Sequence, residues 1–273
     1  MRVLAVIVSY YPNVDLLRKC LGSFIDRVDK VLVWENTPSP ENLKYRLPDN
    51  GKVFYASEGE NIGISKALNK ARDLALNEGF DALLTMDQDS VWHGFDEFLS
   101  AVSSQDAPLG LYGPAVYASS FTEKFNRVDT LITSGMLVLR EVFDRIGGYE
   151  EDFFVDGIDL DFCYKASEAG IPSWVVAGSY LEQRFGGKRT VSFLGFRPEV
   201  YDYSPARLRG ICYSQMVLLR KYSSNPYRKR DFLKHYFLKR IPRIIFFEKD
   251  KCNKVRAIVS GTLQGLRWKP RKS

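Results

Sequence analysis

The sequence predicts an α/β fold in which a mostly parallel sheet carries helices on both faces and a basic helical region follows. Two observations support this prediction. In the first 90 residues, short runs of β-branched and apolar residues alternate with helical patterns, and continuous apolar runs are typical of parallel strands buried on both faces. The length of 273 residues and the apolar content of 45% suit one large domain with a small appendage.

The first 90 residues are expected to fold in the order β-α-β-β-α-β. We expect strands at residues 3–9, 30–34, 52–56 and 81–86, and helices at residues 13–24 and 62–78. Both helical segments repeat apolar residues every three or four positions, which gives each of them one buried face. Further along, we expect strands at 110–117, 129–140 and 173–176, and helices at 141–146, 159–169, 204–222 and 229–266.

Charge is unevenly distributed along the chain. Residues 1–219 hold 22 Lys and Arg against 30 Asp and Glu, a net charge of −8, whereas residues 220–273 hold 17 against 3, a net charge of +14. The basic segment interleaves cations with aromatic side chains, which suits an anionic membrane surface, and a solvated helical face explains it equally well. Nucleic acid is disfavoured as a partner, because the body is acidic and no binding motif is present.

Composition excludes several other classes. No run approaches the roughly 18–20 apolar residues of a membrane-spanning helix, and we expect the N-terminus to be a first strand and not a signal peptide. The four cysteines form no CxxC pair, which argues against a structural zinc site or a disulfide framework. Two histidines leave little for His-rich metal sites, and neither a dinucleotide fingerprint nor a P-loop motif is present.

Polar residues follow three of the expected strands, at Ser9-Tyr10, Glu35-Asn36 and Asp87-Gln88-Asp89. If these strands are parallel, the three strand ends meet at one edge of the sheet, where ligands of open α/β sheets bind. Asp87 and Asp89 can share one hard cation such as Mg²⁺ or Mn²⁺. The alternative is that they cap the following segment.

Two more clusters could carry chemistry. Asn61 and Gly63 lie where the second helix begins, either as a simple helix start or as a place of close ligand approach. Asp156, Asp159 and Asp161 lie among bulky apolar residues near another helix start. There the helix dipole favours negative charge, and apolar surroundings can also raise the proton affinity of an aspartate that acts as a general base.

In this order, the motifs resemble family 2 glycosyltransferases, and most of all their bacterial rhamnosyltransferase-like branch. The resemblance rests on Ser9-Tyr10-Tyr11, Glu35-Asn36, Asn61-Ile62-Gly63 with Asn69, Asp87 with Asp89, and residues 153–163. It covers about residues 1–222. It implies a nucleotide-diphosphosugar transferase fold of the GT-A type, with a catalytic domain at 1–203, divided into a nucleotide-binding half (1–90) and an acceptor-binding half (91–203), and a basic helical C-terminal region at 204–273.

The resemblance also implies an activity and its partners. Such an enzyme moves a sugar, rhamnose-like or another hexose, with inversion and with a divalent cation. The donor is a UDP- or dTDP-linked sugar, and the acceptor is a hydroxyl of a growing, lipid-linked cell-surface polysaccharide. We therefore expect a cytoplasmic protein that is peripheral at the inner face of the cell membrane, with residues 220–273 toward the anionic lipid.

Roles for individual residues follow from the same resemblance. The nucleotide-binding positions are Ser9, Tyr10, Glu35, Asn61, Gly63 and Asp87. Asp89 is expected to hold Mg²⁺ or Mn²⁺ together with Asp87. Asp159 is expected to be the general base. The positions expected near the acceptor or the donor sugar are Ser134, Gly135, Asp156 and Asp161.

Three positions depart from the family pattern. Glu35 stands where the family has Asp, Gln183 where it often has a metal-binding His, and Tyr213-Ser214 where the branch has Arg-Asn. A glutamine offers the metal only a neutral carbonyl oxygen. Gln183 and Tyr213-Ser214 thus favour a second hypothesis, a catalytically weak nucleotide-sugar-binding or scaffold protein of a polysaccharide assembly complex.

Overall fold

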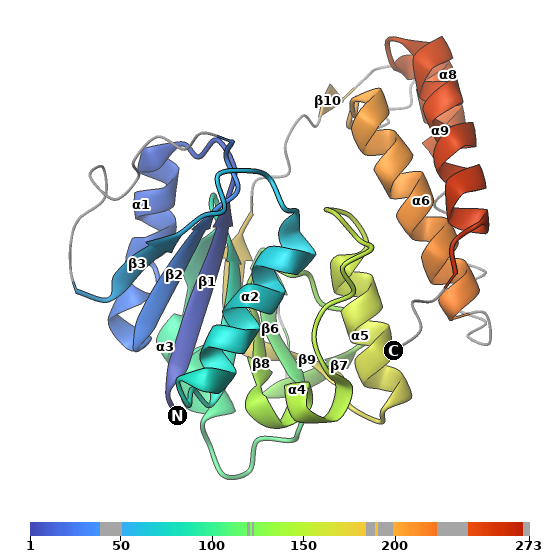
Figure 1. Ribbon diagram of the computed structural model, residues 1–273. Helices are drawn as coiled ribbons and strands as arrows, with labels where there is room; N and C mark the ends of the chain where they lie inside the picture. Colours follow the sequence, from blue (N-terminus) through green and yellow to red (C-terminus); the bar gives the residue numbers. More distant parts are fainter. Residues whose placement is uncertain are drawn as a thin grey trace. The chain divides into compact units, whose positions relative to one another are not determined.

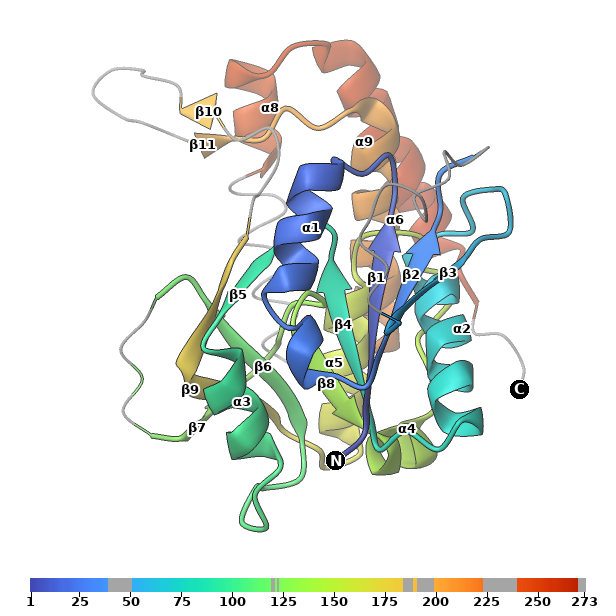
Figure 2. The same ribbon diagram turned by 90° about the vertical axis from the view of Figure 1, so that its left-hand side faces the viewer.

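The computed structural model describes residues 1–38, 51–118, 121, 123–183, 189–190, 199–222 and 240–269. It has two units, Met1–Arg184 and Phe185–Ser273. Figures 1 and 2 together label their helices and strands. The predicted α/β fold class is confirmed in the first unit, whereas the functional division at residue 203 stays a prediction.

The first unit is built on one mixed sheet. Its strands are β1 (Val3–Ser9), β2 (Lys30–Glu35), β3 (Val53–Ala56), β4 (Ala82–Asp87), β5 (Val91–His93), β6 (Leu111–Val116), β7 (Phe125–Val128), β8 (Met136–Leu139) and β9 (Ser173–Glu182). They follow the order β3-β2-β1-β4-β8-β6-β9-β5, and β7 pairs with β9. The strands β3, β2, β1 and β4 are parallel, and β8 runs antiparallel to β4 and β6. The predicted β-α-β-β-α-β order of the first 90 residues is confirmed.

Helices cover both faces of this sheet (Figures 1 and 2). One face carries α1 (Val14–Gly22) and α3 (Phe95–Val102), and the other carries α2 (Ile64–Asn77), α4 (Arg140–Ile146) and α5 (Ile158–Glu168). Residues 3–7 of β1 have no exposed surface. A strand covered on both sides needs apolar residues at every position, which explains the unbroken apolar run in the sequence.

The expected strand at residues 129–140 is wrong in its first half, because β8 begins only at Met136. Leu131 is buried without strand pairing. Its side chain packs against Gly113, and its N–H donates to Cys163 Sγ at 3.3 Å. An apolar run that is buried by tertiary contacts therefore resembled a strand in the sequence. The strands β5 and β7 and the helix α3 were not predicted.

The C-terminal unit contains α6 (Pro205–Lys221), α8 (Ile241–Phe247), α9 (Lys251–Leu266) and a short antiparallel pair of β10 (Arg189–Thr190) with β11 (Glu199–Val200). The expected helix at 204–222 is confirmed. Of the expected helix at 229–266, residues 229–239 lie outside the described residues. The remainder forms two helices separated near Asp250, whose φ is 54°. Among the described residues, no helix has the length and apolar character to span a membrane.

Glycines let α9 pack closely against α6. A Cβ atom at Gly261 would lie 2.2 Å from the carbonyl oxygen of Arg209, and one at Gly265 would lie 2.6 Å from Met216 Cβ. Lys254 is buried on the same helix, where its Nζ donates to Glu248 at 2.8 Å and also contacts Asp202. These contacts fix which face of α9 points inward.

We expect Gly261→Ala to destabilise the C-terminal unit by about 1–3 kcal/mol, because the added methyl group collides with backbone that cannot move aside. Gly210→Ala is the matched control. Gly210 lies on α6 with open space around it, so alanine should raise the helix stability by up to about 1 kcal/mol. Urea unfolding followed by circular dichroism measures both changes. An equal response of the two variants would contradict the close α6–α9 crossing.

Candidate active site

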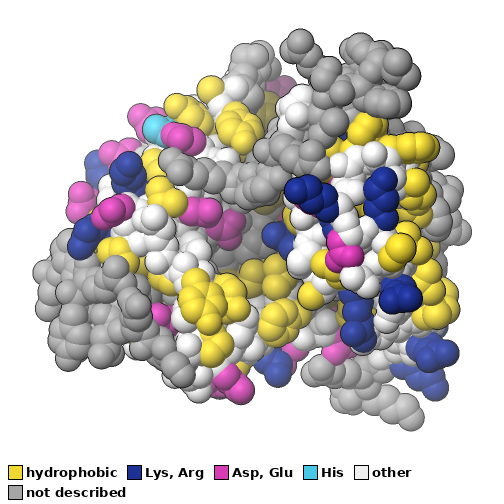
Figure 3. All heavy atoms as spheres, turned by 90° about the horizontal axis from the view of Figure 1, so that it is seen from above, with side chains coloured by type: hydrophobic (Ala, Val, Ile, Leu, Met, Phe, Trp, Pro, Cys, Tyr) yellow, Lys and Arg dark blue, Asp and Glu magenta, His cyan; other side chains and the backbone are white. Residues whose placement is uncertain are grey.

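The carboxyl ends of β1, β2 and β4 meet at one edge of the sheet. Ser9 pairs with Glu35 across β1 and β2, and Val8 pairs with Asp87 across β1 and β4. Figure 3 looks down on this side of the molecule, where Asp and Glu side chains are visible. The convergence of polar strand ends that the sequence predicts is therefore present.

The carboxylates of Asp89 and Asp159 lie within electrostatic range of Asp87 at this edge. Burial, followed by the charges of Asp89 and Asp159, raises the pKa of Asp87 to about 6, against the opposing effect of a hydrogen bond from Gln183. Asp87 and Asp89 come from the end of β4, and Asp159 comes from the first turn of α5. The fold thus brings together acidic groups that are about 70 residues apart in sequence.

Ser134 and Gly135 form a tight turn beside Asp87. The backbone N–H of Asp87 donates to Ser134 Oγ at 3.1 Å, and Ser134 Oγ donates to Ser90 Oγ at 3.1 Å. Gly135 has a φ of 81°, and a Cβ atom there would lie 2.8 Å from Leu181 Cδ1. Only glycine fits this position, so the turn is held rigidly next to the end of β4.

A pocket of about 200 Å³ opens next to this turn. Its lining is mainly apolar and includes Ala115, Leu131, Ile132 and Val175 besides Ser134. It lies near the carboxyl end of β6, which runs parallel to β9 and antiparallel to β8. The pocket is therefore a candidate place for part of the donor sugar or the acceptor.

Asp159 is the member of the 156–161 cluster that faces the other carboxylates. Burial raises its pKa, and the charge of Asp156 raises it further, while a backbone hydrogen bond from Leu160 (2.9 Å to Asp159 Oδ1) lowers it. Asp161, two residues on, is fully buried. Of the three aspartates in this cluster, only Asp159 is among the charges that raise the pKa of Asp87. Asp159 is therefore the candidate base, and Asp161 is its buried neighbour.

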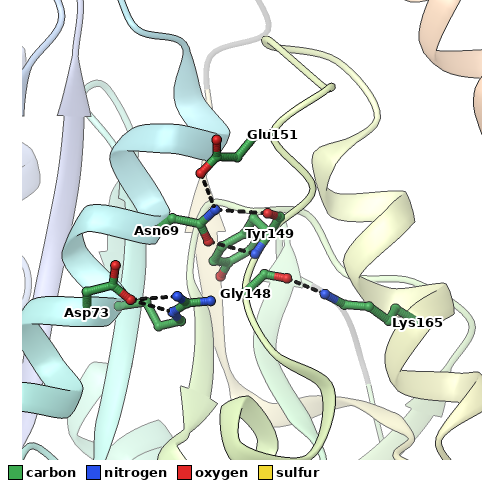
Figure 4. Close-up of polar contacts among 7 residues, drawn as sticks. Asn69, Asp73, Gly148, Tyr149, Glu151 and Lys165 are labelled. Atoms are coloured by element: carbon green, nitrogen blue, oxygen red, sulfur yellow. Dashed lines mark hydrogen bonds and ion pairs between the residues drawn. The ribbon is translucent and has the colours of Figure 1, made fainter. Parts of the chain in front are cut away.

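The segment that leads into α5 is fixed by Asn69 of α2 (Figure 4). Asn69 Nδ2 donates to the carbonyl of Tyr149 at 2.9 Å, and the Tyr149 N–H donates to Asn69 Oδ1 at 2.8 Å. Lys165 of α5 donates to the carbonyl of Gly148. Asn69 is buried, and its amide therefore supports the backbone before the helix of Asp159.

Gly63 supports the same segment from the start of α2. The Ile64 N–H donates to the Phe154 carbonyl at 2.9 Å, and a Cβ atom at Gly63 would lie 2.8 Å from the Phe154 ring. Asn61 Oδ1 accepts a hydrogen bond from the Gly63 N–H at 3.0 Å. The structure gives Gly63 a packing function, and the nucleotide-binding function of Asn61 and Gly63 stays a prediction.

The expected base-binding positions differ in exposure. Ser9 is buried, with its hydroxyl donating to the carbonyl of Trp34 at 3.3 Å, and Glu35 is also buried. Tyr10 and Tyr11 are exposed, and their rings meet edge to face with centroids 4.6 Å apart. The tyrosine pair is the accessible aromatic surface at this strand end, and the sequence reasoning assigned no function to Tyr11 beyond its place in the motif.

Gln88 is a site residue that the sequence reasoning missed. The Tyr10 N–H donates to Gln88 Oε1 at 2.8 Å, and Gln88 Nε2 donates to the Tyr10 carbonyl at 3.1 Å. Tyr11 has a φ of 43°, and its N–H donates to Thr37 Oγ1 at 2.9 Å. The side-chain amide of Gln88 therefore fixes the backbone of Tyr10, the first residue of the tyrosine pair. Its position between the two aspartates was the available signal.

Gln88→Met should raise the KM for the donor about tenfold with little change in kcat, because two hydrogen bonds that position Tyr10 are lost. The side chains have similar length, so the packing change is small. Gln105→Met, at an exposed position, is the matched control and should leave both constants unchanged. Steady-state kinetics with varied donor measures the effect. A fall in kcat at constant KM would show that Gln88 acts elsewhere.

Asp87 and Asp89 could hold a hard divalent cation. The charges of Asp89 and Asp159 raise the pKa of Asp87, and carboxylate oxygens that lie close together are ligands that Mg²⁺ or Mn²⁺ prefers. In the described ranges, no group of three His, Cys, Asp or Glu side chains is arranged as a metal site, so donor phosphate oxygens would have to complete the coordination. Gln183 Nε2 donates to Asp87 Oδ2 at 2.8 Å, and its Oε1 has no hydrogen-bond partner among the described residues.

The fold is that of the GT-A type glycosyltransferases. No family model matches the chain. The chain is 25% identical, over an alignment of 289 residues, to the dTDP-rhamnosyl transferase RfbF of Shigella flexneri, with 97% of this chain and 95% of that protein covered. The rhamnosyltransferase-like resemblance found in the sequence is therefore confirmed, and the assignment to family 2 stays a prediction.

Solved GT-A glycosyltransferases share the fold. S. aureus TarS (residues 1–349) aligns with a TM-score of 0.58 at 13% identity, covering 98% of this chain and 81% of that one. The same fragment in complex with UDP-GlcNAc gives a TM-score of 0.55, with 13% identity and 96% and 80% coverage. GalNAc-T7 with UDP, GalNAc and Mn²⁺ gives 0.57 at 14% identity, covering 80% of this chain, which spans only 48% of GalNAc-T7.

Proposed function

We propose that this protein is an inverting, metal-dependent family 2 glycosyltransferase. It takes a sugar from a UDP- or dTDP-linked donor and adds it to a hydroxyl of a lipid-linked cell-surface polysaccharide. The observation that carries the proposal is the grouping of Asp87, Asp89 and Asp159 at the carboxyl edge of a parallel sheet. The similarity to RfbF makes a dTDP-linked rhamnose the first donor to test.

Asp159 serves as the general base in this reaction. Its carboxylate takes the proton of the acceptor hydroxyl while that oxygen forms a bond to the anomeric carbon. The bond from the anomeric carbon to the diphosphate oxygen breaks on the opposite face, so the configuration inverts. A raised pKa makes the carboxylate a stronger base, and the pKa then lies closer to the working pH.

Asp87 and Asp89 hold Mg²⁺ or Mn²⁺ in the proposed enzyme. Such a cation, when bound, neutralises negative charge on the leaving diphosphate. Ser134 fixes the backbone of Asp87 through its hydrogen bond, and Gln88 fixes Tyr10 beside it. Tyr10 and Tyr11 offer the nucleobase of the donor an aromatic surface. The pocket beside Ser134 is available to the transferred sugar or the acceptor.

The experiment that tests this proposal is a thermal-shift panel of UDP-, dTDP- and GDP-sugars with Mn²⁺, followed by a transfer assay. We expect at least one UDP- or dTDP-sugar to raise the melting temperature with Mn²⁺ but not with EDTA, and to release its nucleoside diphosphate when acceptor is added. Absence of binding by every donor would contradict the proposal.

The second candidate is a nucleotide-sugar-binding scaffold protein with little catalysis. The contact between Gln183 and Asp87 favours it, because a neutral amide occupies the place next to the acidic cluster. The same panel separates the two functions. A scaffold would bind a nucleotide sugar without turnover, and its binding would be insensitive to EDTA.

The cellular setting follows from the proposed acceptor. A lipid-linked saccharide requires the enzyme to work at a membrane, so we place the protein in the cytoplasm, peripheral to the inner face of the cell membrane. The +14 charge of residues 220–273 supports contact with anionic lipid.

A further inference from the structure

The helix α9 has two faces of opposite character. Its inner face packs on α6 through glycines and carries the buried Lys254. The outer face carries a row of apolar side chains that we call the outer stripe. Its members, with exposed fractions of 44%, 52%, 47% and 47%, are Val255, Val259, Leu263 and Leu266. Spacings of four, four and three residues place them on one side of the helix.

The outer stripe cannot exchange places with the inner face. Rotating α9 would replace Gly261 by a larger residue at a point where even a Cβ atom lies 2.2 Å from the α6 backbone. It would also withdraw Lys254 from Glu248 and Asp202. The unit therefore folds with four apolar side chains directed outward. Exposed apolar side chains in a continuous row are typical of surfaces that bind another partner.

Two arginines lie beside the outer stripe. Arg256 of α9 and Arg267 just after its end are exposed next to Val255 and Leu266, and residues 240–269 contain eight Lys and Arg against two Asp and Glu. One of these acids, Glu248, is paired with the buried Lys254. Figure 3 shows Lys and Arg side chains beside hydrophobic ones on this unit. The neighbouring helix α8 exposes Ile245 and Phe246 as well.

We propose that the outer stripe of α9 docks on an anionic lipid bilayer. Helices with apolar residues on one side and cations beside them lie in the membrane interface, with the apolar side chains below the headgroups. Arg256 and Arg267 have long stems that reach lipid phosphates while the stripe enters the acyl boundary. A second copy of the chain is the less favoured occupant, because a symmetric contact would bring the same cations face to face.

This inference deepens the proposed function, since a lipid-linked acceptor would be met at the same membrane. It names a surface that the sequence reasoning did not single out. The sequence prediction assigned the whole of residues 220–273 to the membrane without singling out an apolar face, whereas the structure shows one on α9. The stripe is proposed only to bind lipid, and it contains none of the carboxylates of the acidic edge.

The experiment is vesicle flotation of the full chain. The vesicles contain phosphatidylcholine with one quarter phosphatidylglycerol, or phosphatidylcholine alone. We expect wild type to float with the anionic vesicles and V259E/L263E to lose at least about tenfold of that binding. The charge-matched control N253E/S260E changes two exposed α9 residues outside the stripe and should keep most of it. Circular dichroism verifies that all three proteins are folded.

Three outcomes would overturn the inference. Wild type could fail to float, or both double variants could lose binding equally, which would indicate charge alone. Alternatively, V259E/L263E could turn a dimer into a monomer in light scattering without a change in flotation, which would assign the stripe to a second copy. Transfer to a soluble acceptor analogue should be unchanged in V259E/L263E. A chain that floats as expected but transfers no sugar would refute the proposed function and leave the docking surface standing.

Discussion

Asp159→Asn should leave a folded protein whose turnover falls by about 10²–10⁴-fold, the usual contribution of a general base. Asparagine has the same shape, and its amide oxygen can still accept the hydrogen bond from the Leu160 N–H. It cannot take a proton from the acceptor hydroxyl. Steady-state transfer assays measure the loss, and thermal unfolding verifies the fold. Near-normal transfer by this variant would remove Asp159 from the mechanism.

The pH dependence gives this prediction a second readout. Because burial and the charge of Asp156 raise the pKa of Asp159, its carboxylate is protonated at higher pH than an ordinary aspartate, and activity is lost as pH falls through that raised pKa. Asp156→Asn removes one cause of the shift. It should retain activity and move the acidic limb of the kcat/KM profile to lower pH. An unmoved limb would show that another group controls it.

Asp87→Asn is expected to abolish the response to divalent cation and yet to stabilise the fold at neutral pH. Loss of a cation ligand removes a contribution of several kcal/mol to catalysis, which is about 10²-fold or more in rate. The stability effect has the opposite sign. Asp87 has a pKa of about 6 when folded and an ordinary, lower pKa when unfolded, so ionisation at neutral pH opposes folding.

The sign of this effect depends on pH in a defined way. Below the unfolded pKa of about 4, Asp87 is protonated in both states and costs nothing. Between about 4 and 6 the cost grows, and above 6 it is fully present. Melting temperatures in EDTA should therefore be higher for Asp87→Asn than for wild type at pH 8, by a few degrees, and should converge as pH falls toward 4.

Asp89→Asn is the matched control for the stability effect. It should lose the cation response as well, but the Asp87 carboxyl remains, with a pKa closer to normal because one neighbouring charge is gone. The gain in melting temperature at pH 8 should thus be smaller than for Asp87→Asn. A lower melting temperature of Asp87→Asn at pH 8, or transfer that still responds to Mn²⁺, would contradict the placement of Asp87 in a half-buried acidic cluster.

The sequence was sufficient for the parts of the fold that depend on local pattern and parallel pairing. The unbroken apolar run of β1 required burial on both faces, and parallel pairing then brought Ser9, Glu35 and Asp87 to one edge. The sequence could not show that residues 129–135 lie outside a strand, since Leu131 is buried by packing against Gly113 and Cys163 and not by strand pairing of its own. An apolar residue gives the same sequence signal in both situations.

The direction of side chains was the second feature that the sequence could not predict. Asp159 and Asp161 are two residues apart on a helix and so point to nearly opposite sides, but the sequence alone does not say which side faces β4. The contact of Gln88 with Tyr10 was equally hidden, because it joins the backbone of a residue 78 positions away. Hydrogen bonds of this kind follow from the completed sheet and leave no periodic signal.

The contacts of α2 have a consequence for recombination. Through Ile64 and Asn69, this helix of the N-terminal half holds residues 148–154, which belong to the half that carries Asp159. A chimera that joined the first 90 residues to residues 91–203 of a relative would therefore lose matching contacts between α2 and residues 148–154, however well the strands paired. An exchange of residues 148–168 between relatives therefore has to include α2, so that the two contacting segments are transplanted together.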